Sequence, residues 1–169
     1  GGCLVSVEPV KAMKDLLASF GVASIDCRQD GAKLGCPRPA YLFNTSIAGI
    51  DDADAILLVG TNPRREAPIV NARIRKTWLR HPLAIARIGA AADLTYPVTE
   101  LGETLDVLAK LAAGEGAFCE TLKNARRPML ILGHSALARP DGAAILAAAA
   151  KLAAATGMIG PEGAEGWCG

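Results

Sequence analysis

The chain has 169 residues, of which 51% are hydrophobic, and a formal charge of +1 at pH 7. It can bury about two-thirds of its unfolded surface, and its near-zero charge offers nucleic acid or an acidic membrane no overall attraction. The longest apolar stretch, residues 142–150, is far short of the roughly 18 residues that a membrane span needs, so we expect no direct membrane insertion.

Residues 1–40 predict a lead helix, a strand and a loop. Ser6 can cap a helix that Gly21 ends. The apolar face of this helix is expected to pack on another element and comprises Val10, Met13, Leu16, Leu17 and Phe20. Residues 23–27 are a strand candidate, and residues 28–39, rich in Gly, Pro and charge, predict a loop.

Residues 41–115 predict a first strand–turn–helix unit. A short irregular or helical turn at 41–50 leads to an apolar strand from Asp54 to Gly60. A helix opens at Pro63 and stops before His81. Its apolar positions are Ile69 or Val70, Ile74 and Trp78. The remaining elements are a strand at 83–89, a shorter strand at 94–98, and a helix marked by Leu101, Leu105, Leu108 and Leu111 that ends at Gly114.

Residues 116–169 predict a second unit of the same compact domain, truncated at its C-terminus. Its elements are a helix marked by Phe118, Leu122 and Ala125, a buried strand at 128–133, and an alanine-rich helix that Asp141 caps and Gly157 stops after Thr156. Alternating strands and helices favour an α/β fold, a mostly parallel sheet covered by helices, which is Rossmann-like. The core residues predicted for the two apolar strands are Leu57, Leu58, Ile131 and Leu132.

Five cysteines are scattered along the chain without a Cys-x-x-Cys pair: Cys3, Cys27, Cys36, Cys119 and Cys168. Metal and iron–sulfur sites need several converging ligands, usually supplied in part by closely spaced pairs. We therefore expect reduced thiols and no metal in this segment.

The turn Gly60-Thr61-Asn62-Pro63 follows the first apolar strand and precedes a helix. Open α/β sheets bind their ligands beyond the carboxyl ends of such strands, and the free N–H groups of a helix start favour an anion such as a phosphate. The turn is therefore either a ligand site or the vestige of one.

Two segments resemble the molybdopterin oxidoreductase superfamily. Gly60-Thr-Asn-Pro63, with Pro68 after it, looks like the strand–turn–helix motif that lies in that superfamily against a pterin–guanine dinucleotide. A later segment of the superfamily is similar to Pro128-Met-Leu-Ile-Leu-Gly133, Asp141-Gly142 and residues 156–163.

Within this superfamily, residues 69–79 most resemble the large iron–sulfur subunit of respiratory NADH–quinone oxidoreductase (complex I), with Asp93-Leu-Thr-Tyr96 and Leu101-Gly102 downstream. The resemblance covers about residues 40–165 and is weaker in the first forty.

Two departures from cofactor-binding members predict that no cofactor binds. Those members carry Asp-Pro-Arg after the next strand, and the carboxylate of that Asp contacts the guanosine part of the nucleotide. This chain has Ile88-Gly89-Ala90 there and lacks the acidic side chain. Glu162 and Glu165 flank Gly163 in the later loop, and carboxylates repel a phosphate. The vestigial site would comprise Gly60, Thr61, Asn62, Pro63, Gly160 and Gly163.

No catalytic residue is expected. His81 lies at a helix-to-strand corner, where a solvated or capping role is favoured over catalysis. His134 and Ser135 are adjacent, and adjacent side chains rarely face each other, so Ser135 is expected to satisfy backbone groups of a turn.

Six basic residues flank the helix that follows Pro63: Arg64, Arg65, Arg73, Arg75, Lys76 and Arg80. Two interpretations stay open. The residues form a solvated face that pairs with Asp51, Asp52, Asp54 or Glu66, or they form a docking surface for another subunit or the rest of the chain. Nucleic acid is not an expected partner, because aromatic residues do not accompany the charges.

The resemblance implies a non-catalytic structural and docking domain of the complex I large iron–sulfur subunit. By that resemblance the 4Fe-4S and other iron–sulfur clusters lie in an N-terminal region absent from this chain, and the partners are other hydrophilic-arm subunits and the rest of the polypeptide. The expected location is peripheral, on the cytoplasmic side of the bacterial inner membrane or the mitochondrial matrix face. The alternatives are a cofactor-binding domain of a true molybdenum oxidoreductase, such as a formate dehydrogenase or nitrate reductase, and a free-standing nucleotide binder.

Overall fold

The computed structural model describes residues 5–25, 31–32, 43–104 and 106–159. The chain divides into two compact units, Gly1–Gly31 and Ala32–Gly169, which are described separately. Within the described residues, no helix combines the length and the apolar character that a bilayer crossing requires.

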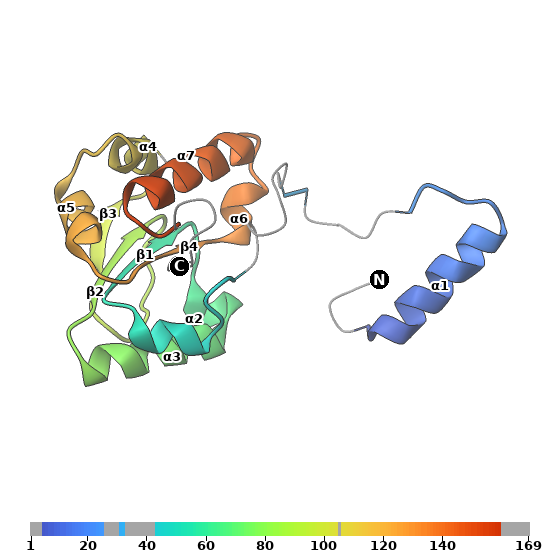
Figure 1. Ribbon diagram of the computed structural model, residues 1–169, viewed down its shortest axis with the longest axis horizontal. Coiled ribbons are helices and arrows are strands. Elements are labelled where there is room, and N and C mark those ends of the chain that lie inside the picture. The colour runs from blue at the N-terminus through green and yellow to red at the C-terminus, as the bar shows by residue number, and fades with distance from the viewer. Residues whose placement is uncertain (1–4, 26–30, 33–42, 105, 160–169) are drawn as a thin grey trace. The chain divides into compact units, whose positions relative to one another are not determined.

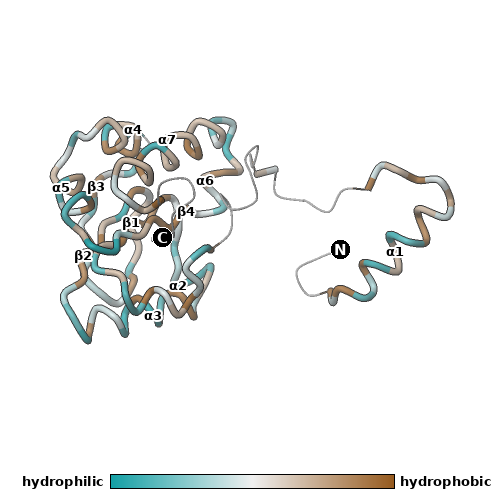
Figure 2. The backbone as a smooth tube through the Cα atoms, in the orientation of Figure 1, coloured by the Kyte–Doolittle hydropathy of each residue, from teal (hydrophilic) through white to brown (hydrophobic). Residues whose placement is uncertain are grey.

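The first unit contains helix α1, Val7–Ser19, which follows Ser6 and ends as Gly21 takes a left-handed φ of +74° (Figure 1). The helix is confirmed, but the Ser6 side chain does not cap it. Hydrogen bonds from the backbone of Glu8 and from Ser6 instead lower the pKa of the Glu8 carboxyl. Apolar and polar residues alternate along α1 (Figure 2), and none of its residues is buried.

The strand predicted at 23–27 is wrong as far as the structure describes it. Residues 23–25 are irregular, because among the described residues no strand pairs with them, and residues 26–27 lie outside the described part. Of the loop predicted at 28–39, only residues 31–32 are described.

The second unit is built on a four-stranded parallel sheet in the order β3-β2-β1-β4. This arrangement, with helices on both faces, confirms the predicted α/β fold class (Figure 1). The strands are β1, Ala55–Val59; β2, Ala84–Ile88; β3, Thr99–Gly102; and β4, Pro128–Leu132.

Strand β1 lies between two apolar layers and is buried over its whole length. Leu57 faces a cluster formed with helices α4, Asp106–Ala112; α5, Ala117–Asn124; and α7, Gly142–Ala155. Ile56 and Leu58 face a second cluster, formed with Ile74 of α3 and with Ile50 of the 3-10 helix η2, Ala48–Asp52. Burial on both faces explains why β1 is a continuous apolar run rather than an alternating one.

The single helix predicted after Pro63 is two helices, α2, Pro63–Glu66, and α3, Pro68–Arg80. Pro68 has no N–H for a hydrogen bond to the preceding turn and disfavours the helical conformation of the residue before it. Ala67 accordingly takes φ −145° and ψ 70°.

The strand predicted at 94–98 is also wrong. Leu94 and Tyr96 are core residues in an irregular segment, and the strand that pairs with β2 is Thr99–Gly102. Leu101 therefore belongs to β3 rather than to the next helix, which begins at Asp106.

Two further differences concern the C-terminal part of the unit. Helix α6, His134–Leu137, was not predicted. Asp141 precedes α7 as predicted, but its side chain makes no capping hydrogen bond, because both carboxylate oxygens accept from the guanidinium of Arg139 at 2.8 and 2.9 Å.

The predicted burial of Leu57 and Leu58 is confirmed, but that of Ile131 and Leu132 is wrong. Both of the latter side chains are only partly buried, because β4 is an edge strand of the described sheet. Ile131 lies in register beside Leu58, so the two positions form a matched pair of central and edge residues.

We expect Leu58→Ala to lower the free energy of unfolding by about 2–5 kcal/mol, because it leaves a cavity in the closed core. Ile131→Ala should cost less, since the structure can collapse around a partly exposed site. Urea unfolding of both variants measures the difference. Equal losses would contradict the edge position of β4.

Candidate functional site

The carboxyl ends of three strands meet at a glycine-lined edge formed by Gly60 after β1, Gly89 after β2 and Gly133 after β4. Gly60 donates its N–H to Ile88 at 2.8 Å, and Gly133 donates to Val59 at 2.7 Å. A Cβ on Gly133 would lie 2.0 Å from the carbonyl oxygen of Gly60, so only glycine permits this approach. The edge is the place where an α/β sheet holds a ligand.

The turn that follows Gly60 is occupied by the chain's own carboxylate. The Thr61 hydroxyl donates to Glu66 at 2.9 Å, and the Asn62 N–H donates to the other oxygen of Glu66 at 2.8 Å. This arrangement resembles a capping box, in which a carboxylate satisfies free donors at a helix start. Two of the donors that a phosphate would use at this turn are therefore already bonded within the turn.

Helix α6 covers the same edge. The Ser135 hydroxyl donates to the carbonyl oxygen of Gly60 at 2.8 Å, which confirms the predicted backbone role of Ser135. Ala136 is buried, and a Cβ on Gly60 would lie 2.7 Å from its methyl group. Gly60 is thus half-buried, with α6 packed against one side of it.

A pocket of about 610 Å³ lies beside this edge and is lined by Asn62, Arg64, Arg65, Ala91, Ala92 and Asp93. Arg64 donates to the carboxylate of Asp93 at 2.5 Å and to its carbonyl oxygen at 3.1 Å. The Thr95 N–H, with Arg64 second, holds the pKa of the Asp93 carboxyl below its ordinary value. The pocket therefore contains one acid, and that acid is held by the chain's own arginine.

Arg87 is a functional candidate that the sequence analysis missed. Its side chain is 1% exposed, binds the carboxylate of Glu100 on β3 and donates to the carbonyl oxygen of Ala92 at 3.0 Å. The sequence feature that could have identified it is a charged residue inside the apolar run of β2. Arg87 ties the edge strand and the β2–β3 connection to the sheet. It holds Ala92 in the wall of the 610 Å³ pocket but does not itself line that pocket.

A second buried network fixes the same connection from the side of α3. The Tyr96 hydroxyl donates to the Asn71 side chain at 2.8 Å, and the Asn71 amide donates to the carbonyl oxygen of Leu94 at 3.2 Å. Burial raises the pKa of the Tyr96 phenol. Tyr96 is therefore a neutral structural group at ordinary pH.

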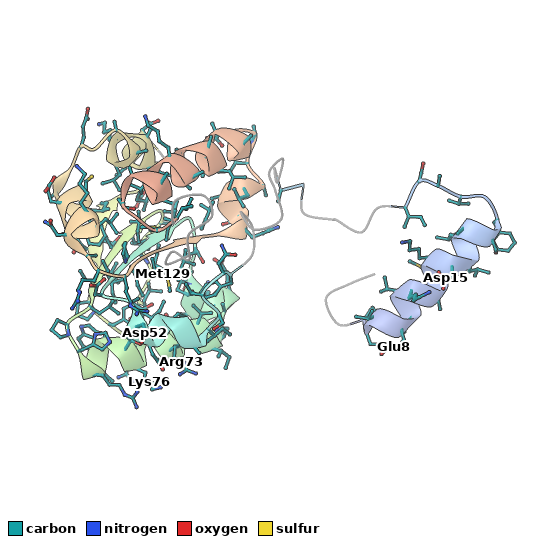
Figure 3. All side chains as sticks on the ribbon, viewed as in Figure 1. Glu8, Asp15, Asp52, Arg73, Lys76 and Met129 are labelled. Carbon is teal, nitrogen blue, oxygen red and sulfur yellow. The ribbon has the colours of Figure 1, made fainter. Side chains whose placement is uncertain are left out.

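The structure splits the six basic residues into two sets. Arg73 and Lys76 of α3 (Figure 3) both bind Asp51, at 2.8 and 3.2 Å, and Arg64 binds Asp93. Arg75 donates to the carbonyl oxygen of Thr95 at 3.3 Å. Within the described part of the chain, no acidic side chain binds Arg65, Arg75 or Arg80.

Only one of the four acids considered as partners of this helix pairs with it. Burial acts to raise the pKa of the Asp51 carboxyl, but hydrogen bonds and charge from Lys76 and Arg73 outweigh it and lower that pKa. Asp52 instead pairs with Arg127, and Asp54 accepts backbone N–H groups that precede β4.

The two histidines occupy separate places. Nε2 of His81 lies 3.1 Å from the carbonyl oxygen of Asp51, which suits the structural corner role expected for it. His134 begins α6, and its neighbour Ser135 is bonded to Gly60. Gly160 and Gly163 of the predicted vestigial site, with Glu162 and Glu165, lie outside the described residues. Among those described, no three His, Cys, Asp or Glu side chains converge on a metal position.

The comparison with protein families gives a match over nearly the whole chain. The sequence profile described as molybdopterin oxidoreductase covers residues 2–169. The chain belongs to this family.

Individual relatives give a more specific similarity than the family match does. The chain is 39% identical over 162 residues to the mitochondrial NADH dehydrogenase [ubiquinone] iron-sulfur protein 1 of Solanum tuberosum, covering 95% of the chain and 22% of that protein. It is 41% identical over 152 residues to the G subunit of the NADH-quinone oxidoreductase of Rickettsia bellii, covering 89% and 22%. The same subunit of Rickettsia felis is 40% identical over 154 residues, with 90% and 23% covered. The chain thus spans less than a quarter of the length of these relatives.

In the part of this molybdopterin oxidoreductase domain that the structure describes, the glycine edge is a poor fit for a phosphate of the molybdopterin that the family name implies. The N–H of Asn62 and the hydroxyl of Thr61 already bind Glu66, whose carboxylate would repel a phosphate. Ala136 covers Gly60, where the backbone of a phosphate-binding turn must be accessible. The connection after β2 begins Gly89-Ala90 and offers no acidic side chain at that point.

We expect Asp51 to contribute to stability above about pH 4 and to lose that contribution as the pH falls through its depressed folded pKa. Between about pH 5 and about pH 2 the free energy of unfolding of Asp51→Asn should therefore fall less steeply than that of the unsubstituted chain. Urea unfolding at several pH values checks this, with Asp15→Asn in the other unit as the control. Parallel pH profiles for the chain and Asp51→Asn would refute the role of this pairing.

Proposed function

We propose that the chain is a non-catalytic structural and docking domain of the large iron–sulfur subunit of NADH–quinone oxidoreductase, complex I. The similarity to the bacterial NADH-quinone oxidoreductase subunit and to the plant iron-sulfur protein 1 supports this assignment. The function of the assembly would be to carry electrons from NADH to quinone in the respiratory chain. The iron–sulfur clusters would lie elsewhere in the subunit, and this domain would hold none.

One observation carries the non-catalytic part of the proposal, namely the Glu66 carboxylate inside the Gly60–Pro63 turn. A helix that starts at the carboxyl edge of a parallel sheet presents free N–H groups there, and such groups can bind a phosphate. Here an internal carboxylate takes the same donors. A covalently attached anion at a distance of four residues has a high effective concentration, so a free phosphate competes poorly with it.

Docking through α2 and α3 is the positive role in this proposal. Arg65, Arg75 and Arg80 supply guanidinium groups that bind no acidic side chain in the described part of the chain, and guanidinium suits bidentate contacts with carboxylates. Partners would be other subunits of the hydrophilic arm and the rest of the polypeptide. The domain would be peripheral, on the cytoplasmic side of the bacterial inner membrane or the matrix face in mitochondria.

We expect no binding of GDP in calorimetric titration of the chain at concentrations up to about 100 μM, because Glu66 and Ala136 close the glycine edge. The titration distinguishes this function from a cofactor-binding domain of a formate dehydrogenase or nitrate reductase type. Micromolar binding that is lost in Gly60→Asp would support the enzyme instead.

The docking role predicts that charge reversal on α2 and α3 weakens assembly. In the complete subunit, Arg65→Glu with Arg75→Glu should reduce co-purification with other complex I subunits by roughly tenfold, since like charges then face the partner's carboxylates. Lys151→Glu on the exposed side of α7 reverses a single charge elsewhere and serves as the control for each arginine reversed alone. Unchanged recovery of the double variant would exclude Arg65 and Arg75 from the docking surface.

A further inference from the structure

The opposite edge of the sheet, where the parallel strands begin, gathers three loops that are far apart in the sequence. Asp54 precedes β1, residues 81–83 precede β2, and Arg126-Arg127 precede β4. The Asp54 carbonyl accepts the Ala84 N–H at 3.1 Å, and the Asp54 N–H lies 3.4 Å from the Arg127 carbonyl oxygen, so the loops are in contact. We call this surface, Asp54, residues 78–84 and residues 126–127, the amino-terminal rim.

The rim contains a shallow pocket of about 560 Å³ whose mixed lining includes the apolar side chains of Trp78, Leu79 and Pro82. Leu79 in this lining is 62% exposed, Pro82 is exposed, and Trp78 is half-buried against the core. Leu79 lies near the end of α3, and most of its surface is open to solvent. Bulky apolar and aromatic side chains around a hollow are the kind of surface in which a partner's side chain is anchored.

The charges of the rim are unbalanced. The carboxylate of Asp54 accepts the backbone N–H groups of Arg126 and Arg127 at 2.8 and 2.9 Å, and Asp52 pairs with Arg127 at 3.5 Å. The local acids are therefore engaged. Arg80 and Arg126 are exposed, and no acidic side chain in the described part of the chain binds either guanidinium.

We propose that the amino-terminal rim docks an acidic segment of a separate polypeptide. One bulky apolar side chain of that segment enters the pocket beside Trp78 and Leu79, and carboxylates on either side of it bind Arg80 and Arg126. This inference rests on the proposed docking function. It names a further surface, which shares Arg80 with the docking residues above, and the chemistry of its partner.

The combination of features selects this partner. A separate chain gains from unbalanced charge, because electrostatic attraction speeds the encounter of two folded molecules, whereas a segment already tethered needs no such steering. A nucleic acid would need exposed aromatic faces for stacking, and Trp78 packs against the core. An anionic membrane is held by clusters of about 4–8 cations, more than the two unpaired guanidinium groups of the rim.

A photo-reactive p-benzoylphenylalanine in place of Leu79, introduced into the complete subunit in its own cells, tests the proposal. Leu79 is 62% exposed, so the replacement leaves the core intact. Irradiation should cross-link the benzoylphenylalanine at position 79 to another polypeptide. The cross-linked peptide should contain an apolar residue between carboxylates. The same group at Lys151 is the positional control and should give no such product.

Charge variants sharpen the test. Arg80→Glu and Arg126→Glu should each lower the yield of that cross-link by about tenfold, while Lys151→Glu should leave it within about twofold. Cross-links to the same polypeptide, to a second copy of the subunit, or to lipid or nucleic acid would overturn the proposal, as would no cross-link in a complex that contains the subunit. Absence of the subunit from the complex would instead refute the proposed function.

Discussion

The burial of β1 on both faces is the constraint on which the rest of the domain depends. Ala55–Val59 is buried throughout and pairs in parallel with β2 on one side and β4 on the other. Because all neighbours run in the same direction, one edge collects every carboxyl end and the other collects every amino end. The glycine edge and the amino-terminal rim are thus two consequences of one strand.

The glycine edge has the geometry of a ligand-binding edge, but two of its donors are satisfied within the chain. The close approach of Gly133 to Gly60 still requires glycine, and a helix still begins after Pro63. The donors of the turn, however, bind Glu66, and α6 lies over Gly60. A few side chains at this edge are enough to satisfy those donors internally. They can do so without changing the fold, because the sheet does not depend on what its edge binds.

Charge on α3 is divided by geometry rather than by residue type. The side chains of Arg73 and Lys76 are one turn apart and converge on Asp51, which lies on η2 against the same face. Arg65 and Arg80, at the ends of the α2–α3 segment, find no acid in the described part of the chain. Surface pairs of this kind contribute little to stability, so the unpaired groups are free to serve recognition.

The sequence alone determined the elements whose signals are local. The apolar run of β1, the alanine-rich α7 with Gly157 after it, and the glycines beyond the strands all follow from patterns within a few residues. It also indicated the family, because the motif around Gly60 is local too. The sequence analysis predicted one continuous helix after Pro63, because the apolar periodicity does not show that Pro68 divides it in two.

Only the tertiary structure decided which residues meet across the sheet. Ile131 and Leu58 are both in apolar runs, yet one is partly exposed because β4 lies at the edge. Arg87 can be buried because Glu100 on the neighbouring strand pairs with its charge. The Asp54 carboxylate accepts a backbone N–H that precedes β4, 72 residues away, instead of pairing with a basic side chain of α3. Strand order and such distant partners leave no periodic signal in a single sequence, because they depend on where the chain returns and not on what the local residues prefer.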